Sequence, residues 1–166
     1  MTRLAHGLTP DRRVPGIADV TPELLREMGV RAVITDLDNT LALPEDIRPT
    51  EAGAAWLRTM EAAGIPVTVV SNNHRPRVEA FCRPLRVPFV ERCGKPFGRG
   101  IRRAMALLGV SRREVALVGD QLFTDVLAAS WNRIPCILTE PIVPETDTFF
   151  KCKRALERLL TKNTRR

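Results

Sequence analysis

Two carboxylates lie two residues apart, Asp36 and Asp38, where the strand-like segment RAVITD runs into DNTLA. Two more, Asp120 and Asp125, follow the apolar segment EVALVG. Aspartates brought to one point repel one another and raise one another's pKa unless a cation holds them. Oxygen ligands favour Mg²⁺, which retains waters and commonly shares its coordination shell with a phosphate. The acidic residues therefore predict phosphate chemistry with Mg²⁺ as cofactor.

Other polar side chains follow the neighbouring strand-like segments. Ser71 and Asn72 come directly after IPVTVV, and Lys95 follows VPFV. Each has a simple structural explanation when taken alone, because Ser caps helices, Asn shapes turns and a Lys is usually solvated. Polar groups at four successive strand ends are harder to explain as independent caps. We therefore expect them to form one site with the aspartates.

The elements that must position these residues alternate along the chain. The predicted strands are RAVITD, IPVTVV, VPFV, EVALVG and IPCILT. Helical patterns cover PTEAGAAWLRTMEAAG, FGRGIRRAMALLG and TDVLAASWN, and the first two end at Gly64 and Gly109. Alternation of this kind favours parallel pairing, so the predicted fold is a three-layer, Rossmann-like α/β domain. Ligands bind at the carboxyl ends of the strands in such folds.

The chain has 166 residues, of which 44% are hydrophobic, and this length suits one domain spanning residues 1–166. Residues 1–30 are interpreted as an N-terminal extension. The four cysteines form no C-x-x-C pair and no cluster with His6 or His74, which argues against zinc and a disulfide framework. No segment has the character of a signal peptide or membrane span, so we expect a soluble, cytoplasmic protein with reduced thiols.

Basic residues outnumber acidic ones, and the net charge is +7. This balance favours anionic partners, namely nucleic acid, phosphorylated metabolites or acidic lipid headgroups, without choosing among them. Near the C-terminus, FFKCKRALERLL predicts a basic amphipathic helix over residues 147–166. Such a helix either docks on its own sheet or makes peripheral contact with an anionic membrane.

Four ordered motifs, DLDNTL, SNN, GKP and GDQLFTD, resemble those of the haloacid dehalogenase (HAD) phosphatase superfamily. The N-terminal LTPDRRVPGIADVTPELLREMGVRAVITDLDNTLA further resembles the YqeG-type branch of subclass IIIA, which is related to mitochondrial phosphatidylglycerophosphate phosphatases. The motif resemblance spans Asp36 to Asp125. It implies a HAD fold and a phosphoric monoester hydrolase.

The resemblance also implies roles for individual residues. Asp36 would attack phosphorus and become an aspartyl phosphate, and Asp38 would act as general acid and base, its backbone carbonyl facing Mg²⁺. Ser71 and Lys95 would bind the phosphoryl group. A larger set completes the site: Asp36, Asp38, Asp120 and Asp125 around the metal, and Asn72 near the substrate. Thr40 and Asn39 are interpreted as turn residues.

The spacing of the motifs leaves no room for a large cap domain. Asp36 and Ser71 are 71 − 36 = 35 positions apart, and Ser71 and Lys95 are 95 − 71 = 24 apart. Unless a neighbouring subunit in an oligomer supplies a lid, the active site should be open. An open site suits a bulky substrate or a headgroup presented at a surface.

Three functional classes follow from the sequence. The preferred one is a Mg²⁺-dependent phosphomonoesterase with phosphatidylglycerophosphate as the candidate substrate, placed in the cytoplasm with peripheral contact at the inner membrane surface. The second would dephosphorylate a nucleotide or a nucleic-acid end, which the positive charge favours but the absence of Tyr does not. The third is a noncatalytic, phospho-accepting interaction protein, against which the retained Asp38 argues.

Overall fold

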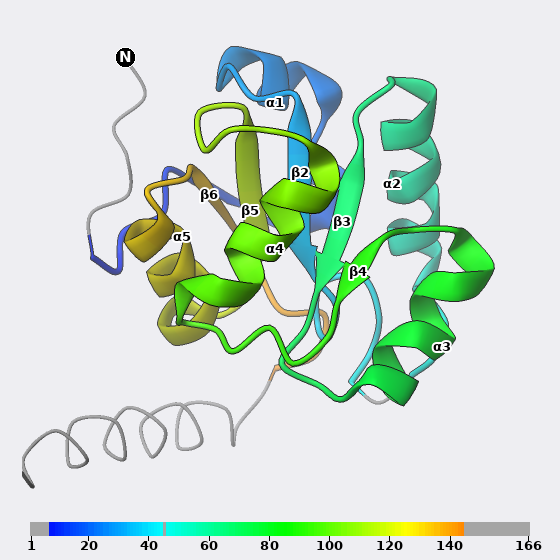
Figure 1. Cartoon of the computed structure of the whole chain (residues 1–166). Coiled ribbons are helices and arrows are strands. Elements are labelled where there is room, and N and C mark those ends of the chain that lie inside the picture. Colours follow the sequence, from blue (N-terminus) through cyan, green and yellow to red (C-terminus); the bar gives the residue numbers. More distant parts are fainter. Residues whose placement is uncertain (1–6, 45, 145–166) are drawn as a thin grey trace, which may run out of the picture.

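One six-stranded sheet, entirely parallel, forms the centre of the computed structural model, which describes residues 7–44 and 46–144 (Figure 1). In spatial order the strands are β1 (Arg12–Val14), β6 (Cys136–Thr139), β5 (Val115–Gly119), β2 (Ala32–Asp36), β3 (Val67–Val70) and β4 (Phe89–Val90). The five predicted strands are confirmed. The sheet also contains β1, which the sequence did not indicate.

Helices cover both faces of the sheet, as predicted for a three-layer α/β fold. In chain order they are η1 (Ile17–Asp19), α1 (Pro22–Glu27), α2 (Glu51–Ala62), α3 (Arg75–Leu85), α4 (Gly98–Leu108), η2 (Leu122–Val126) and α5 (Leu127–Asn132). Side chains of α1, α2 and α3 form one hydrophobic core with Val33, Val69 and Val118 of the strands. Side chains of α4 and α5 form a second core with Ile34 and Leu117.

The described part of the N-terminal 30 residues is built into the fold. Strand β1 pairs with β6, and Val20 and Leu25 are fully buried. The indole N–H of Trp56 in α2 donates to the carbonyl oxygen of Val20 at 2.8 Å. This segment therefore completes one edge of the sheet and one of its two cores.

Helix α3 carries two prolines that obscure its helical pattern in the sequence. Pro76 lies in the first turn, where a missing N–H costs little, and Pro84 lies one residue before the helix ends. Val78 and Phe81 are buried against the sheet, and this packing holds the helix in place despite both prolines. The helix begins four residues after Ser71, and it therefore reaches the active-site end of the sheet.

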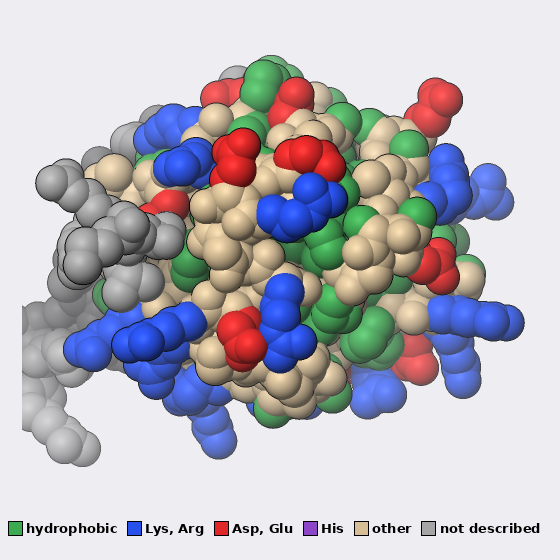
Figure 2. Space-filling model, turned by 90° about the horizontal axis from the view of Figure 1, so that it is seen from above, with side chains coloured by type: hydrophobic (Ala, Val, Ile, Leu, Met, Phe, Trp, Pro, Cys, Tyr) green, Lys and Arg blue, Asp and Glu red, His purple; other side chains and the backbone are tan. Residues whose placement is uncertain are grey.

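The two ends of the sheet differ in character. At the end where the strands begin, α2, α3 and α4 border a mainly apolar groove of about 460 Å³, lined by Leu57, Ile65, Leu85 and Leu108 among others. Figure 2 looks onto this end and shows hydrophobic side chains exposed between Lys and Arg side chains. The polar site residues lie at the opposite end.

Three cysteines, Cys82, Cys93 and Cys136, are buried free thiols. Burial raises the pKa of Cys82 to about 12 and that of Cys93 to about 11, so both remain neutral. The fourth cysteine and the predicted helix over 147–166 lie outside the described residues. Within residues 7–44 and 46–144, no helix combines the length and apolar character needed to cross a bilayer.

Candidate active site

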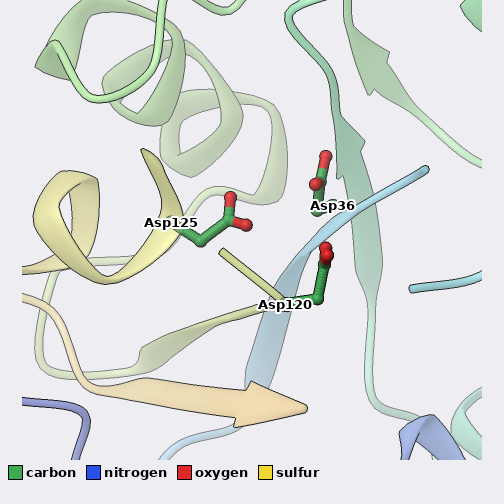
Figure 3. A group of neighbouring side chains, drawn as sticks. All are labelled: Asp36, Asp120 and Asp125. Atoms are coloured by element: carbon green, nitrogen blue, oxygen red, sulfur yellow. The ribbon is translucent and has the colours of Figure 1, made fainter. Parts of the chain in front are cut away.

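Three carboxylates meet where β2 and β5 end (Figure 3). Asp36 is the last residue of β2, Asp120 follows β5, and Asp125 lies in η2. One carboxylate oxygen from each of the three lies within 4.8 Å of those from the other two. The single π turn of η2 brings Asp125 back toward the sheet, with the Val126 N–H donating to Gln121 five residues earlier at 3.2 Å. The structure therefore brings together the three aspartates predicted from separate strand ends.

Lys95 lies between two of these carboxylates. Its Nζ is 2.8 Å from Asp36 Oδ1 and 2.6 Å from Asp125 Oδ1, and its side chain is only 2% exposed. Burial alone would lower the pKa of Lys95, but the carboxylates of Asp125 and Asp36 outweigh it and raise the pKa above its usual range. Lys95 is therefore a permanent cation in the site.

The net charge of the three carboxylates and Lys95 is negative. With Asp36, Asp120 and Asp125 ionised, three negative charges face one positive charge from Lys95. Burial and the repulsion among these carboxylates raise the pKa of Asp36 to about 7 and that of Asp120 to about 8. A hard divalent cation would remove this imbalance, because it carries the missing two charges and prefers carboxylate oxygens. The donor set therefore fits a divalent metal ion.

Neighbouring groups fix these carboxylates in place. The Thr40 hydroxyl donates to Asp120 Oδ1 at 3.1 Å, so Thr40, interpreted as a turn residue, orients a member of the acidic cluster. Asp125 Oδ2 accepts the backbone N–H of Gln121 at 3.2 Å. A Cβ atom on Gly119 would overlap the Asp125 carboxyl group, so only glycine leaves room for this carboxylate at the end of β5.

The loops after β3 and β4 are tied to each other beside the acidic cluster. The Asn72 amide donates to the Lys95 carbonyl at 3.0 Å and accepts the Lys95 backbone N–H at 2.8 Å. Asn72 therefore positions Lys95. The Ser71 hydroxyl oxygen accepts the Asn73 N–H at 3.0 Å, and its own O–H donates to no other described residue.

Asp38 does not join the acidic cluster through its side chain. Its Oδ1 accepts from Arg77 Nη2 at 2.8 Å, and its Oδ2 accepts from Asn73 Nδ2 at 2.7 Å. It nevertheless lines the same pocket of about 200 Å³ as Asp36, Ser71 and Lys95. The two acidic residues of DLDNTL therefore face one pocket from different electrostatic surroundings.

Sequence reasoning missed three polar residues of the site: Gln121 and Thr124, which line the pocket, and Arg77, which pairs with Asp38. Arg77 lies in the first turn of α3 and is 7% exposed, and its Nε and Nη1 have no hydrogen-bond partner among the described residues. Burying these donors unpaired is costly, so the guanidinium must be held by its pairing with Asp38 and by the packing of α3. No local pattern in the sequence links positions 38 and 77.

Comparisons with known proteins agree with this geometry. A model of the haloacid dehalogenase-like hydrolase family matches residues 47–131. Over 149 residues the chain is 38% identical to the probable phosphatase YqeG of Bacillus subtilis (strain 168), covering 90% of this chain and 87% of that protein. The chain therefore belongs to the haloacid dehalogenase-like hydrolases and is a phosphatase of that family. The resemblance to the YqeG-type branch is confirmed.

Solved structures share the fold at low sequence identity. An uncharacterized protein from Listeria monocytogenes serotype 4b gives a TM-score of 0.55 at 12% identity, over 75% of this chain and 99% of that one. A putative 3-deoxy-D-manno-octulosonate 8-phosphate phosphatase from Vibrio cholerae gives 0.53 at 13% identity, over 69% and 70%. The cobalt-bound deoxy-D-mannose-octulosonate 8-phosphate phosphatase from Haemophilus influenzae gives 0.51 at 19% identity, over 69% and 80%. These likenesses confirm the predicted fold.

Replacing Arg77 with Lys should lower the turnover of an aryl phosphate by up to about 100-fold, because small misplacements of a reacting group are costly. Lysine keeps the positive charge but loses the planar fork that holds the Asp38 carboxylate. Arg75→Lys is the matched control, since Arg75 lies on the same helix and is 62% exposed. Equal turnover in the two variants, at unchanged thermal stability, would contradict a positioning role for Arg77.

Mg²⁺ should stabilise the protein more at pH 8 than at pH 6. The raised pKa values mean that the metal-free folded state binds more protons than the unfolded state between about pH 4 and pH 8, so its free energy of unfolding falls as pH rises through this range. A bound cation offsets that loss. Thermal unfolding with Mg²⁺ or with a chelator measures the difference at each pH.

In this measurement Asp120→Asn should lose most of the Mg²⁺-dependent rise in Tm. Glu61→Gln, an exposed residue in the groove at the other end of the sheet, should retain it. An undiminished rise in Asp120→Asn would place the metal elsewhere.

Proposed function

We propose that this phosphatase hydrolyses a phosphate monoester with Mg²⁺ through a phosphorylated Asp36, and that its substrate is a lipid-linked phosphate, with phosphatidylglycerophosphate as the candidate. One observation carries the chemistry. The carboxylate at the end of β2 lies in an open pocket, paired with a buried Lys95 and beside two further carboxylates that suit a divalent cation.

Asp36 is the nucleophile in this proposal. A carboxylate oxygen forms a bond to phosphorus, and the bond from phosphorus to the ester oxygen breaks. Lys95 lies 2.8 Å from Asp36 Oδ1, where it can orient the nucleophile and balance negative charge on the phosphoryl oxygens. Because Asp125 holds the same ammonium group, Lys95 keeps its position when Asp36 becomes phosphorylated.

Asp38 is the general acid and base in this proposal. In this mechanism Asp38 enters the reaction protonated, gives that proton to the departing ester oxygen and becomes a carboxylate. It then regains a proton from the water that cleaves the aspartyl phosphate. Arg77 and Asn73 hold its carboxylate at the pocket wall without bringing it into the acidic cluster. Asp36 can therefore attack phosphorus while Asp38 approaches the leaving group.

Ser71 and the metal ligands complete the proposal. The Ser71 hydroxyl already accepts the Asn73 N–H, so its own proton can be donated to a phosphoryl oxygen. Asp36, Asp120 and the Asp38 backbone carbonyl would hold Mg²⁺, with Asp125 acting directly or through a water. When bound, Mg²⁺ would supply positive charge that stabilises the phosphoryl oxygens.

The substrate part of the proposal is supported by the openness of the site. Residues 37–50 connect β2 to α2 and residues 71–74 connect β3 to α3, so neither connection contains an inserted cap. The basic net charge and an open site suit a phosphorylated headgroup at an anionic membrane surface. The alternative substrates are a nucleotide or the phosphorylated end of a nucleic acid, which the same chemistry would hydrolyse.

Two substitutions in DLDNTL separate the proposed roles. Asp36→Asn, or removal of Mg²⁺ by a chelator, should abolish turnover of an aryl phosphate. Asp38→Asn should still bind Mg²⁺ but turn over about 100-fold to 10,000-fold more slowly, the usual cost of losing a general acid and base. Full activity in Asp36→Asn would refute the covalent step. Wild-type turnover in Asp38→Asn would assign the proton transfers elsewhere.

The substrate assignment is tested by comparing the turnover of different classes of phosphate ester. We expect phosphatidylglycerophosphate in mixed vesicles to be turned over faster than nucleotide and sugar phosphates, and its advantage to shrink at high ionic strength as charges are screened. Purified protein is assayed on each substrate at low and high salt. Faster turnover of the soluble compounds would refute the lipid assignment and leave the phosphatase chemistry unaffected.

A further inference from the structure

Exposed hydrophobic side chains gather at the active-site end of the molecule. Eight large hydrophobic residues of the described chain are exposed, and five of them lie in loops that follow β2, β4 and β6, where the strands end. These five are Leu43 (38% exposed), Ile47 (54%), Phe97 (48%), Ile142 (38%) and Val143 (39%). Soluble surfaces seldom concentrate such residues without a partner.

An aromatic pair extends this surface beside the catalytic lysine. Phe97 lies two residues after Lys95, and its ring centroid is 5.6 Å from that of Trp131 in α5. Trp131 is 52% exposed, so about half of each member of the pair faces solvent. Trp131 does not line the catalytic pocket. We call Phe97, Trp131 and the four aliphatic residues Leu43, Ile47, Ile142 and Val143 the apolar rim.

Helices α4 and α5, which meet at the aromatic pair, carry no acidic residue. Helix α4 carries Arg99, Arg102 and Arg103 and no acidic residue, α5 carries no charged residue, and Arg133 follows it. A Cβ on Gly98 would meet Arg102 Nη1 and the Asn132 side chain, which places the start of α4 directly against the end of α5. The pair is therefore flanked by the arginines of α4 and by Arg133 at the end of α5.

We propose that the apolar rim is a docking surface for an anionic lipid bilayer. Trp and Phe place their rings at the level of lipid headgroups, aliphatic side chains enter the acyl boundary, and arginines attract anionic lipids. This inference rests on the proposed lipid-linked substrate, because docking through the rim would turn the open pocket toward the headgroups.

The composition of the rim favours a bilayer over nucleic acid. Single-stranded nucleic acid binds to aromatic faces on which bases stack, along a basic groove. Here the two rings are tilted by 44° and contact each other, and the other four rim residues are aliphatic. Aliphatic side chains have no face on which a base can stack. Moving each of them from water into a bilayer is favourable.

The two tryptophans allow a direct test. Trp56 is 3% exposed and Trp131 is 52% exposed, so a change in emission on adding vesicles reports mainly on Trp131. Vesicles of phosphatidylcholine with phosphatidylglycerol should shift the emission to shorter wavelength, and brominated acyl chains should quench it. The emission shift and the quenching should both be smaller with vesicles of phosphatidylcholine alone, or at high salt.

Vesicle sedimentation then compares Trp131→Ser with Leu107→Ser. Leu107 is 58% exposed but lies in the groove at the opposite end of the sheet, which makes it a matched control. Trp131→Ser should weaken binding to the anionic vesicles about 10-fold, the change expected when one large apolar side chain is no longer buried. Leu107→Ser should bind as wild type does.

The outcomes separate docking from catalysis. Aryl phosphate turnover should be equal in both variants and wild type, because neither residue touches the pocket. If the wild-type protein does not hydrolyse the aryl phosphate at all, the proposed function is refuted. The vesicle result can still be interpreted in that case. Equal vesicle binding by both variants, or emission that responds to a single-stranded oligonucleotide but not to vesicles, would overturn the docking surface.

Discussion

The ion pairs of Lys95 are the interaction on which the active site depends. A buried ammonium group is stable only when nearby anions repay the loss of its hydration, and here Asp36 and Asp125 do so at 2.8 and 2.6 Å. The same pairing lets two carboxylates approach each other closely. The ammonium group is one positive charge short of balancing Asp36 and Asp125, and two short once Asp120 is included. The ionised cluster therefore fits a divalent cation, which would supply the two missing charges.

The parallel sheet makes this arrangement possible. Strands β2, β3, β4 and β5 run in one direction, so the residues after each strand arrive at the same edge although they are far apart in sequence. Local devices then refine the positions. The amide of Asn72 clamps the backbone of Lys95, and the π turn after Gln121 carries Asp125 to the ammonium group. The sheet provides proximity, and these contacts provide orientation.

The sequence indicated the parts of this structure that have local signals. Buried strands are continuous apolar runs, and the acidic cluster follows from polar residues at their ends. Strand β1 gave no signal, because its three residues, RRV, are mostly exposed and are ordered by pairing with β6. Helix α3 was hidden by Pro76 and Pro84. The pairing of Arg77 with Asp38 joins positions 39 residues apart, and only the folded chain brings them together.

The contact between Asp38 and the distant Arg77 explains how one short motif provides two carboxylates in different surroundings. Asp36 and Asp38 are two residues apart, yet the first is 7% exposed against Lys95 and other carboxylates, while the second bonds to Arg77 and Asn73. Distinct surroundings are what allow two chemically identical groups to take different roles. Because α3 supplies Arg77 and the loop before it supplies Asn73, the orientation of Asp38 depends on a helix whose packing against the sheet outweighs its prolines. In the proposed mechanism, the acid and base function would thus depend on tertiary packing, whereas the nucleophile would depend on the strand itself.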